Sequence, residues 1–248
     1  MKRIEYILYE VGGKIRDELL GLTSNDVDYT VVLPGNTLPE AEAFELFVKT
    51  LELDGFRVHI DYPERLTVKA KFPADHKYSG DADFVLARKE IGYVPGTRDP
   101  ITEIGTIEDD LLRRDFTVNT LAKGPDGNIL DLCGGLADLN SKLLRTPFDP
   151  KKSFSDDPLR IIRGIRFCIM KDFTMSSDMI DAIRQIGLAG IEVVSKERIQ
   201  DELNKCFKFD TPKTLKWLFM MEKDFGFPLL SYTFETTGLW IELTDKKR

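Results

Sequence analysis

The first half of the chain mixes short apolar runs of two-residue period with segments of helical spacing. Residues 26–33 show the clearest strand pattern, because Val27, Tyr29 and Val31 alternate with Asp26, Asp28 and Thr30. Strands are predicted for residues 6–11, 26–33, 57–60, 66–72 and 82–87, and helices for residues 14–20, 39–53 and 106–122. The Gly- and Pro-rich residues 90–105 predict a loop, and residues 124–135 predict a turn-rich return.

The second half is helical by its spacing. Helices are predicted for residues 158–170, 177–186, 196–207 and 212–224. An α+β amino-terminal half is therefore expected to lead into an all-helical half, with the boundary near residue 145.

Charge is unevenly distributed along the 248 residues. The whole chain carries 35 Lys+Arg against 42 Asp+Glu, a net charge of −7, which argues against non-specific nucleic-acid binding by the entire surface. Residues 142–171, however, hold eight Lys+Arg and three Asp, a basic segment that fits an anionic partner. No stretch approaches the roughly 20 apolar residues of a membrane helix, so no membrane partner is expected.

The cysteines bear on the compartment. Cys133, Cys168 and Cys206 are scattered, odd in number and lack metal-ligand spacing, which favours a reduced, cytoplasmic protein. The sequence predicts no oligomeric state.

Paired carboxylates are the sharpest chemical feature. Asp26 and Asp28 share one face of their predicted strand, where two unpaired acids repel and a divalent cation such as Mg²⁺ would stabilise them. A solvated strand end is the competing interpretation of so short a pattern. Asp81 or Asp83 on a later strand would supply a third acid, and their shared face leaves the choice open. Three convergent carboxylates suit two-metal nucleotidyl transfer.

Two further segments have both a structural and a phosphate-binding interpretation. Gly12-Gly13 between a strand and a helix could turn the backbone or present N–H groups to a triphosphate, with Lys14 and Arg16 adding positive charge. The spacing of a Walker A loop is absent. Arg113-Arg114-Asp115 follows the acidic residues 108–110, so it either forms helical i,i+4 ion pairs or binds phosphate, with Asp115 orienting an arginine.

The basic segment centres on the helix predicted from residue 158. Asp157 is expected to cap this helix, with Pro158 at its first position, and a cap can also bind a ligand. Arg160, Arg163 and Arg166 follow at three-residue steps, beside a buried isoleucine side. This stripe favours an anion or nucleotide site about as strongly as a plain charged face.

Together these segments resemble one family, the bacterial-type (class II) tRNA nucleotidyltransferases and bacterial poly(A) polymerases. The resemblance is carried in order by VGGKIRDELLG with DVD, RRDFTVNTLA, DLCGGLADL, DDPLRIIRGIRF and SKERIQDEL, at residues 11–28, 113–122, 131–139, 156–167 and 195–203. Asp156 replaces a common Glu, and Thr120-Leu121 replaces a common Ala-Met.

The resemblance implies a role for each matching residue. Asp26, Asp28 and Asp83 would be catalytic and bind two Mg²⁺ ions, with Asp83 chosen over Asp81 because it lies five residues before Arg88. The nucleotide-binding set would comprise Gly12, Gly13, Lys14, Arg16, Arg113, Arg114, Asp115, Asn119, Asp157, Arg160, Arg163 and Arg166. Within it, Arg114 and Arg113 would hold the triphosphate, and Asp157 and Arg160 would select cytosine or adenine.

The implied fold is a polymerase-β-like head at residues 1–145, a helical neck at 146–210 and a short remnant of a body domain at 211–248. The family continues for well over a hundred further residues, so this chain is expected to lack most of the body and tail. The implied activity is template-independent transfer of CMP and AMP from CTP and ATP to an RNA 3′-hydroxyl. The favoured activity is completion of the CCA end of tRNA, and the alternatives are poly(A) synthesis or addition of only C or only A.

Overall fold

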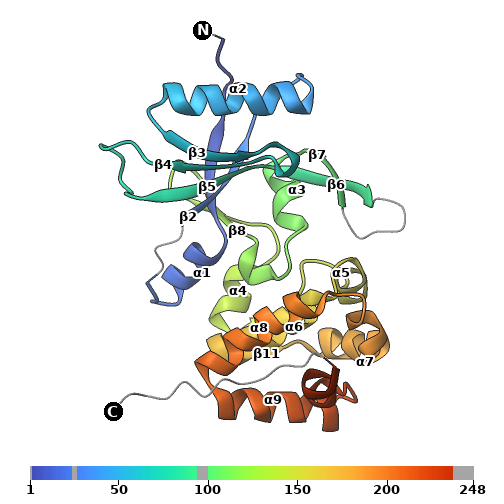
Figure 1. Cartoon of the computed structure of the whole chain (residues 1–248). Coiled ribbons are helices and arrows are strands. Elements are labelled where there is room, and N and C mark those ends of the chain that lie inside the picture. The colour runs from blue at the N-terminus through green and yellow to red at the C-terminus, as the bar shows by residue number, and fades with distance from the viewer. Residues whose placement is uncertain (1, 24–26, 94–99, 237–248) are drawn as a thin grey trace. The chain divides into compact units, whose positions relative to one another are not determined.

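The chain divides into two compact units, Met1–Leu139 and Asn140–Arg248. The computed structural model describes residues 2–23, 27–93 and 100–236. The first unit holds a mixed sheet with helices and the second is mainly helical (Figure 1), which confirms the α+β fold class. The boundary between the units follows Leu139, while the three-part division at residues 145 and 210 stays a prediction.

The sheet of the first unit places β2 and β5 side by side at its centre. Its order is β3-β4-β5-β2-β1-β8-β9, and of these neighbours only β2 and β5 run parallel. The strands are β1 (Ile7–Val11), β2 (Val27–Val32), β3 (Arg57–Tyr62), β4 (Thr67–Lys71), β5 (Asp81–Leu86), β8 (Leu121–Lys123) and β9 (Ile129–Asp131). The five strands predicted before residue 88 are confirmed.

Helices lie on both faces of this sheet (Figure 1). On one face, α2 (Glu40–Leu53) buries Phe44, Phe47 and Leu51 against Val31 and Phe84 of the strands, which forms the main core. On the other face, α3 (Ile107–Leu112) packs beside β1 and β8. The short helix α1 (Gly13–Leu19) follows β1 directly. The alternating strand pattern therefore leaves every second side chain of β2 and β5 on the α3 face.

Two predictions between residues 88 and 122 are wrong. The predicted loop contains a hairpin of β6 (Arg88–Tyr93) and β7 (Pro100–Ile104), with a register shift between Glu90 and Gly92. The exposed Ile91 and the interrupting Gly92 hide the strand pattern.

The predicted helix at 106–122 begins as expected, with a capping box between Thr106 and Asp109, but ends at Leu112. The Asp115 carboxylate then accepts the Phe116 N–H, and Phe116 is extended. This local side-chain bond competes with helix continuation. A single 3₁₀ turn, Thr117–Asn119, leads into β8.

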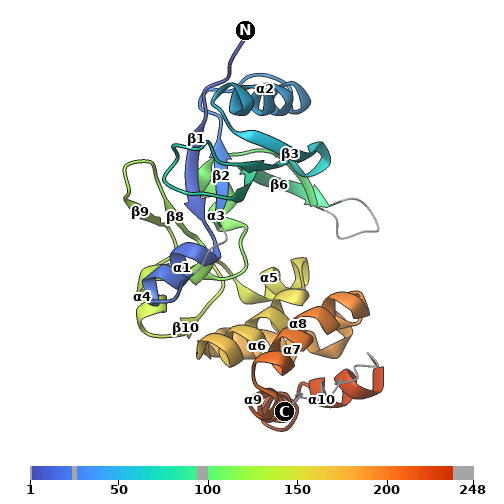
Figure 2. The ribbon, with the colours of Figure 1, turned by 60° about the vertical axis from the view of Figure 1, so that its left-hand side comes forward.

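The second unit is a bundle of short helices, seen from another side in Figure 2. It contains α5 (Pro150–Asp156), α6 (Leu159–Lys171), α7 (Ser177–Ile191), α8 (Lys196–Phe209), α9 (Thr211–Lys223), α10 (Leu229–Ser231) and a final π-helical turn at Tyr232–Thr236. Two short strands, β10 (Leu143–Leu144) and β11 (Thr174–Met175), pair in parallel. The short helix α4 (Gly135–Asn140) connects the two units in sequence. Among the described residues, no helix is long and apolar enough to span a membrane.

Candidate active site

Asp28 and Asp83 are direct neighbours on the two central parallel strands. Asp28 of β2 is the register partner of Asp83 of β5. Val27 and Tyr29 are buried on the α2 face, so the alternating backbone places Asp28 on the opposite face, where it is exposed. Asp26, predicted to complete the set, lies outside the described residues.

Asp81 and Asp83 differ in their surroundings, although they share one face of β5. Asp81 lies two residues before Asp83, the register partner of Asp28, and the Asp81 carboxylate contacts His59 Nε2 at 3.1 Å. Asp83 sits beside Asp28 and is half-buried. This arrangement favours Asp83 as the acid that acts with Asp28, in agreement with the resemblance.

Gly12 lies against both Asp28 and Arg114. A Cβ atom added at Gly12 would come within 3.5 Å of Asp28 Oδ2 and 3.8 Å of an Arg114 Nη atom. The backbone of Gly12 has φ 79° and ψ −143°, a region open essentially to glycine alone. At Gly13, an added Cβ would come within 3.2 Å of the Arg16 guanidinium. The Gly pair thus brings the backbone close to an acid and two arginines.

Replacing Gly12 by Ala is expected to destabilise the protein because of this backbone conformation. We expect a loss of about 1–3 kcal/mol in the free energy of unfolding, measured by urea denaturation. Gly92→Ala is the matched control, since Gly92 has no left-handed φ and open space around it, and it should change stability by less than about 1 kcal/mol. Equal stability of the two variants would contradict the expectation that a side chain at position 12 strains the backbone.

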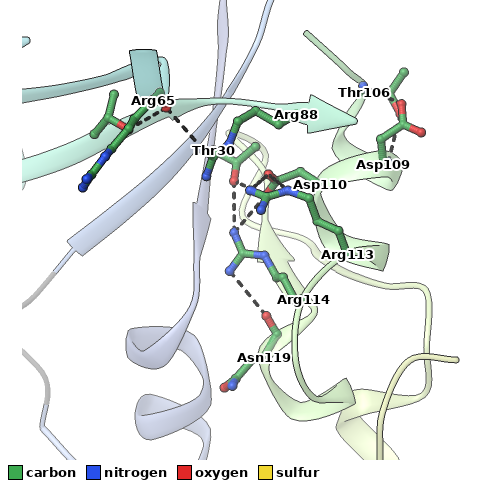
Figure 3. A network of polar contacts seen from close by, with 10 residues as sticks. Thr30, Arg65, Arg88, Thr106, Asp109, Asp110, Arg113, Arg114 and Asn119 are labelled. Carbon is green, nitrogen blue, oxygen red and sulfur yellow. Dashed lines mark hydrogen bonds and ion pairs between the residues drawn. The ribbon is translucent and has the colours of Figure 1, made fainter. Parts of the chain in front are cut away.

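A buried carboxylate holds the arginines of the second motif. Asp110 is 1% exposed and receives hydrogen bonds from Arg113 at 2.6 Å, Arg114 at 3.0 Å and Thr30 at 2.8 Å (Figure 3). Arg114 also donates to the hydroxyl of Thr30, two residues along β2 from Asp28. The sequence had offered helical ion pairs or phosphate binding as alternatives. The helical ion pairs are present, and they fix Arg114 beside the carboxylate face.

The charge balance of this cluster is positive. Burial raises the pKa of Asp110, but the nearby Arg114 and Arg113 outweigh it and lower the pKa to about 2, so the carboxylate is ionised. Arg88 adds a third guanidinium, whose pKa is lowered by burial and by Arg113, and its buried Nε has no hydrogen-bond partner among the described residues. Three arginines therefore outnumber the two acids that act on them, Asp110 (Figure 3) and, at Arg88, Glu90, an arrangement suited to an anionic ligand.

Arg16 is held by the second motif. Its guanidinium donates to Asn119 Oδ1 at 2.6 Å, and Asn119 Nδ2 donates to Asp115 at 2.8 Å. Arg16 also contacts its neighbour Asp17 and is 8% exposed. Hydrogen bonds thus join three residues predicted for nucleotide binding, Arg16, Asn119 and Asp115. Asp115 acts here through Asn119 and through the Phe116 backbone.

Lys14 is buried against an aromatic side chain of the protein itself. It is 6% exposed, its ammonium lies 3.5 Å from the centre of the Tyr78 ring, and Tyr78 donates to Glu10. Glu10 precedes Val11, the register partner of Asp28, so Glu10 belongs to the opposite face of the sheet. Burial raises the pKa of Glu10, but bonds from Lys77 and Tyr78 lower it overall. The proposed contact of Lys14 with nucleotide stays a prediction.

In the second unit, Asp157 and Arg160 lie one turn apart. The helix α6 begins one residue later than predicted, with Pro158 at its N-cap, and Asp157 is the C-cap residue of α5. Its carboxylate still accepts the Leu159 N–H at 3.2 Å, as a cap would. Arg160 donates to the Ser153 hydroxyl at 2.8 Å. The two side chains present an acceptor and a donor from adjoining positions.

The arginine stripe is partly neutralised by a residue that the sequence analysis missed. Arg166 Nε donates to Glu202 of α8 at 2.5 Å, and Lys205 contacts the other Glu202 oxygen at 2.7 Å. Burial raises the pKa of Glu202, but Lys205, Arg166 and then Arg163 lower it overall. The isoleucine side expected for α6 is buried, as predicted, and consists of Ile161, Ile162, Ile165 and Ile169.

Thr30 and Arg88 were also missed, and Asp110 was anticipated only as one of the acids 108–110 that could pair with the arginines. A positional signal existed for Asp110, which stands three and four residues before Arg113 and Arg114 on one helix. Thr30 follows Asp28 at the strand period, so its face was predictable. No signal in the sequence identifies Arg88 as a buried neighbour of this cluster.

Asp28 and Asp83 offer oxygen donors of the kind that hard divalent cations prefer. Within the described ranges no group of three His, Cys, Asp or Glu side chains is placed to hold a metal ion. Asp26 lies outside these ranges, so the described part of the site supplies two carboxylates. The donor chemistry of these two carboxylates fits a hard divalent cation such as Mg²⁺.

Comparison with known proteins identifies the class. Residues 8–145 match the family described as the poly A polymerase head domain, and the chain belongs to this family. This match spans the Gly pair, both described carboxylates and the arginine cluster.

Particular relatives are tRNA-processing enzymes. The chain is 39% identical to tRNA nucleotidyltransferase cca2 of Schizosaccharomyces pombe, over 79% of this chain and 42% of the relative. It is 33% identical to a CCA-adding enzyme of Pseudomonas putida, over 83% and 51%. The chain thus spans about half the length of these relatives.

Solved structures of similar enzymes confirm the fold of a polymerase-β-like head followed by helices. A tRNA nucleotidyltransferase complexed with a primer tRNA and an incoming ATP analog superposes with a TM-score of 0.69 at 29% identity, covering 93% of this chain and 60% of that one. The CCA-adding enzyme of Bacillus stearothermophilus in complex with CTP gives 0.68 at 26%, covering 86% and 47%.

Proposed function

We propose that the protein transfers nucleoside monophosphates from CTP and ATP to the 3′-hydroxyl of a tRNA that lacks its terminal CCA. The observation that carries this proposal is the pairing of Asp28 with Asp83 on adjacent strands, with Gly12 and Arg114 alongside. The similarity to CCA-adding enzymes over most of the chain supports the choice of substrates. In the reaction, the 3′-oxygen bonds to the α-phosphorus, pyrophosphate leaves, and the hydroxyl proton passes to solvent.

Asp26, Asp28 and Asp83 would hold two Mg²⁺ ions. When bound, such ions favour ionisation of the attacking hydroxyl and stabilise the negative charge of the leaving pyrophosphate. The carboxylates themselves fix the position of the reacting groups at the parallel strands. We propose magnesium as the metal that these carboxylates bind.

Positive side chains of the first unit would bind the triphosphate. Arg114 and Arg113 are held in place by Asp110, and Arg16 is held by Asn119, which Asp115 in turn orients. Such preorganised donors stabilise phosphate charge without rearrangement during the reaction. Backbone N–H groups of Gly12 and Gly13, and the ammonium of Lys14, would add to this set.

In the second unit, Asp157 and Arg160 would select the base. A carboxylate acceptor and a guanidinium donor discriminate between base edges, because the wrong edge leaves a polar group unpaired. Arg163 and Arg166 would also bind the nucleotide, with Glu202 fixing Arg166. We also propose a cytoplasmic location. The three cysteines are free thiols, which is typical of proteins in that reducing compartment.

The test is extension of defined RNAs with one nucleotide at a time. Three tRNAs, ending before CCA, after the first C and after the second C, are incubated with Mg²⁺ and CTP or ATP. CTP should add two, one and no residues respectively, and ATP should extend only the third tRNA. A ladder from ATP alone on unrelated RNA would instead establish poly(A) synthesis, and a stop after C would establish partial addition.

A further inference from the structure

One part of the catalytic sheet face carries basic and aromatic side chains with no role so far. On β4, Val68 and Ala70 are buried beneath α2, whereas Lys69 and Lys71 alternate with them and are exposed on the opposite face. That opposite face is the one that bears Asp83, since Lys69 is the register partner of Asp83. The β4 lysines therefore continue the carboxylate face outward from the reacting centre.

The same face continues onto the edge strand β3. Arg57 is the register partner of Lys71, Ile60 that of Lys69, and Tyr62 that of Thr67. Cross-strand partners share a face, so these side chains join the lysines. We call Arg57, Ile60, Tyr62, Lys69 and Lys71 the β3–β4 surface. Tyr62 and Ile60 are 41% and 45% exposed, which is unusual for large apolar side chains next to one another.

This surface carries three cations, of which two lie in register with acids of β5, Lys69 with Asp83 and Lys71 with Asp81. Arg57 and Lys71 stand directly opposite each other on neighbouring strands, a like-charge pair that destabilises a sheet. Asp81 is the partner of Lys71 on the other side, but its carboxylate contacts His59. Among the described residues no ion pair engages Arg57, Lys69 or Lys71. An anion bound here would relieve the repulsion.

Protection of the sheet edge does not account for these residues. Basic side chains on an edge strand discourage association of sheets, which would explain Arg57 on β3. Lys69 and Lys71, however, belong to the second strand, which has a neighbour on each side. An exposed aromatic ring beside unpaired cations is the combination that binds single-stranded nucleic acid, with the ring stacking on a base and the cations contacting phosphates.

We infer that the β3–β4 surface holds the 3′-terminal nucleotides of the acceptor RNA, with Lys69 and Lys71 on phosphates and Tyr62 stacked on a base. The inference rests on the proposed function, because it requires a 3′-hydroxyl near Asp28 and Asp83. The register sequence Lys69, Asp83, Asp28 runs straight across three strands, so an RNA end on this surface leads directly to the carboxylates.

The experiment measures RNA and CTP binding separately. Fluorescence anisotropy with a 5′-labelled tRNA lacking CCA gives the RNA affinity at several salt concentrations, and equilibrium dialysis gives the CTP affinity. The double variant Lys69→Ala/Lys71→Ala should bind this RNA about tenfold more weakly, and the slope of log K against log salt should become shallower by about 1.4. Tyr62→Ala should weaken RNA binding roughly 5- to 150-fold without changing the slope. CTP affinity should stay unchanged in both.

The matched control is Lys2→Ala/Lys49→Ala, which removes the same charge beside α2, where both lysines pair with exposed glutamates. It should bind RNA within about twofold of the wild type. The inference is overturned if the Lys69/Lys71 variant binds RNA like the wild type, or if the control loses as much affinity. Extension of tRNA by the wild type is measured separately. If the wild type extends tRNA and the variants bind RNA as the wild type does, the role of this surface is refuted but the proposed function is not.

Discussion

Asp28→Asn abolishes nucleotide transfer to tRNA in our account, lowering the rate by about a thousandfold or more. The substitution keeps the size of the side chain but removes the charge that would hold a divalent cation beside Asp83. Loss of metal-based charge stabilisation costs several kcal/mol of transition-state binding, and about 4 kcal/mol corresponds to a thousandfold. The measurement is single-turnover incorporation of CMP into tRNA lacking CCA.

Asp81→Asn provides the matched control for this result. Asp81 lies on the same strand and the same face as Asp83, two residues away, but contacts His59. We expect this variant to keep at least a third of the wild-type rate, whereas Asp83→Asn should match Asp28→Asn. If Asp81→Asn were inactive and Asp83→Asn active, the assignment of the third carboxylate would be wrong.

Asp110→Ala is expected to be among the most destabilising substitutions in the first unit, lowering the free energy of unfolding by about 3–5 kcal/mol. Removing one member of a buried ion-pair network leaves the remaining charges without compensation. Arg113, Arg114 and Thr30 all lose a partner at once. Urea denaturation followed by circular dichroism measures the loss. Glu108→Gln, on the exposed side of the same helix, should cost less than about 1 kcal/mol.

The same carboxylate predicts how stability depends on pH. The pKa of Asp110 is about 2 in the folded protein against an ordinary value of 3.8, so the folded state favours the ionised form. This contribution of about 2 kcal/mol is fully present above pH 4 and is lost as the pH falls from about 4 to 2. The difference in stability between wild type and Asp110→Ala should therefore shrink over that acidic window. A difference that stays constant down to pH 2 would contradict the ionised state of Asp110.

The strands at the centre of the sheet were predictable because their burial is one-sided. In β2, buried Val27, Tyr29 and Val31 alternate with residues of the other face, and the sequence shows this period directly. The hairpin of β6 and β7 was missed because neither strand has an apolar alternation to reveal it. The helix predicted to residue 122 ends at Leu112, and the Asp115 carboxylate then bonds its own neighbouring backbone, a contact that competes with helix continuation and that helical spacing cannot indicate.

The chemistry of the candidate site was predictable only in part. The residue types at positions 28, 83, 113 and 114 pointed to metal and phosphate, but the strand pattern alone left Asp81 and Asp83 equivalent, and only the resemblance favoured Asp83. The register of β2 with β5 supports Asp83, since it places this residue directly beside Asp28 from a strand far away in the sequence. The contact of Arg16 with Asn119 likewise joins segments more than 100 residues apart. Roles for individual side chains remain predictions that the substitutions above test.

The most direct test of the central claim is the sequence of the products made on an unbiased RNA pool. Total small RNA, stripped of terminal CCA by controlled trimming, is incubated with the protein, Mg²⁺, CTP and ATP, and the new 3′ ends are sequenced. The account predicts that CCA is restored on tRNAs while other RNAs stay unextended, and that Asp28→Asn yields no additions. Adenylate tails spread over RNAs of every kind would contradict it.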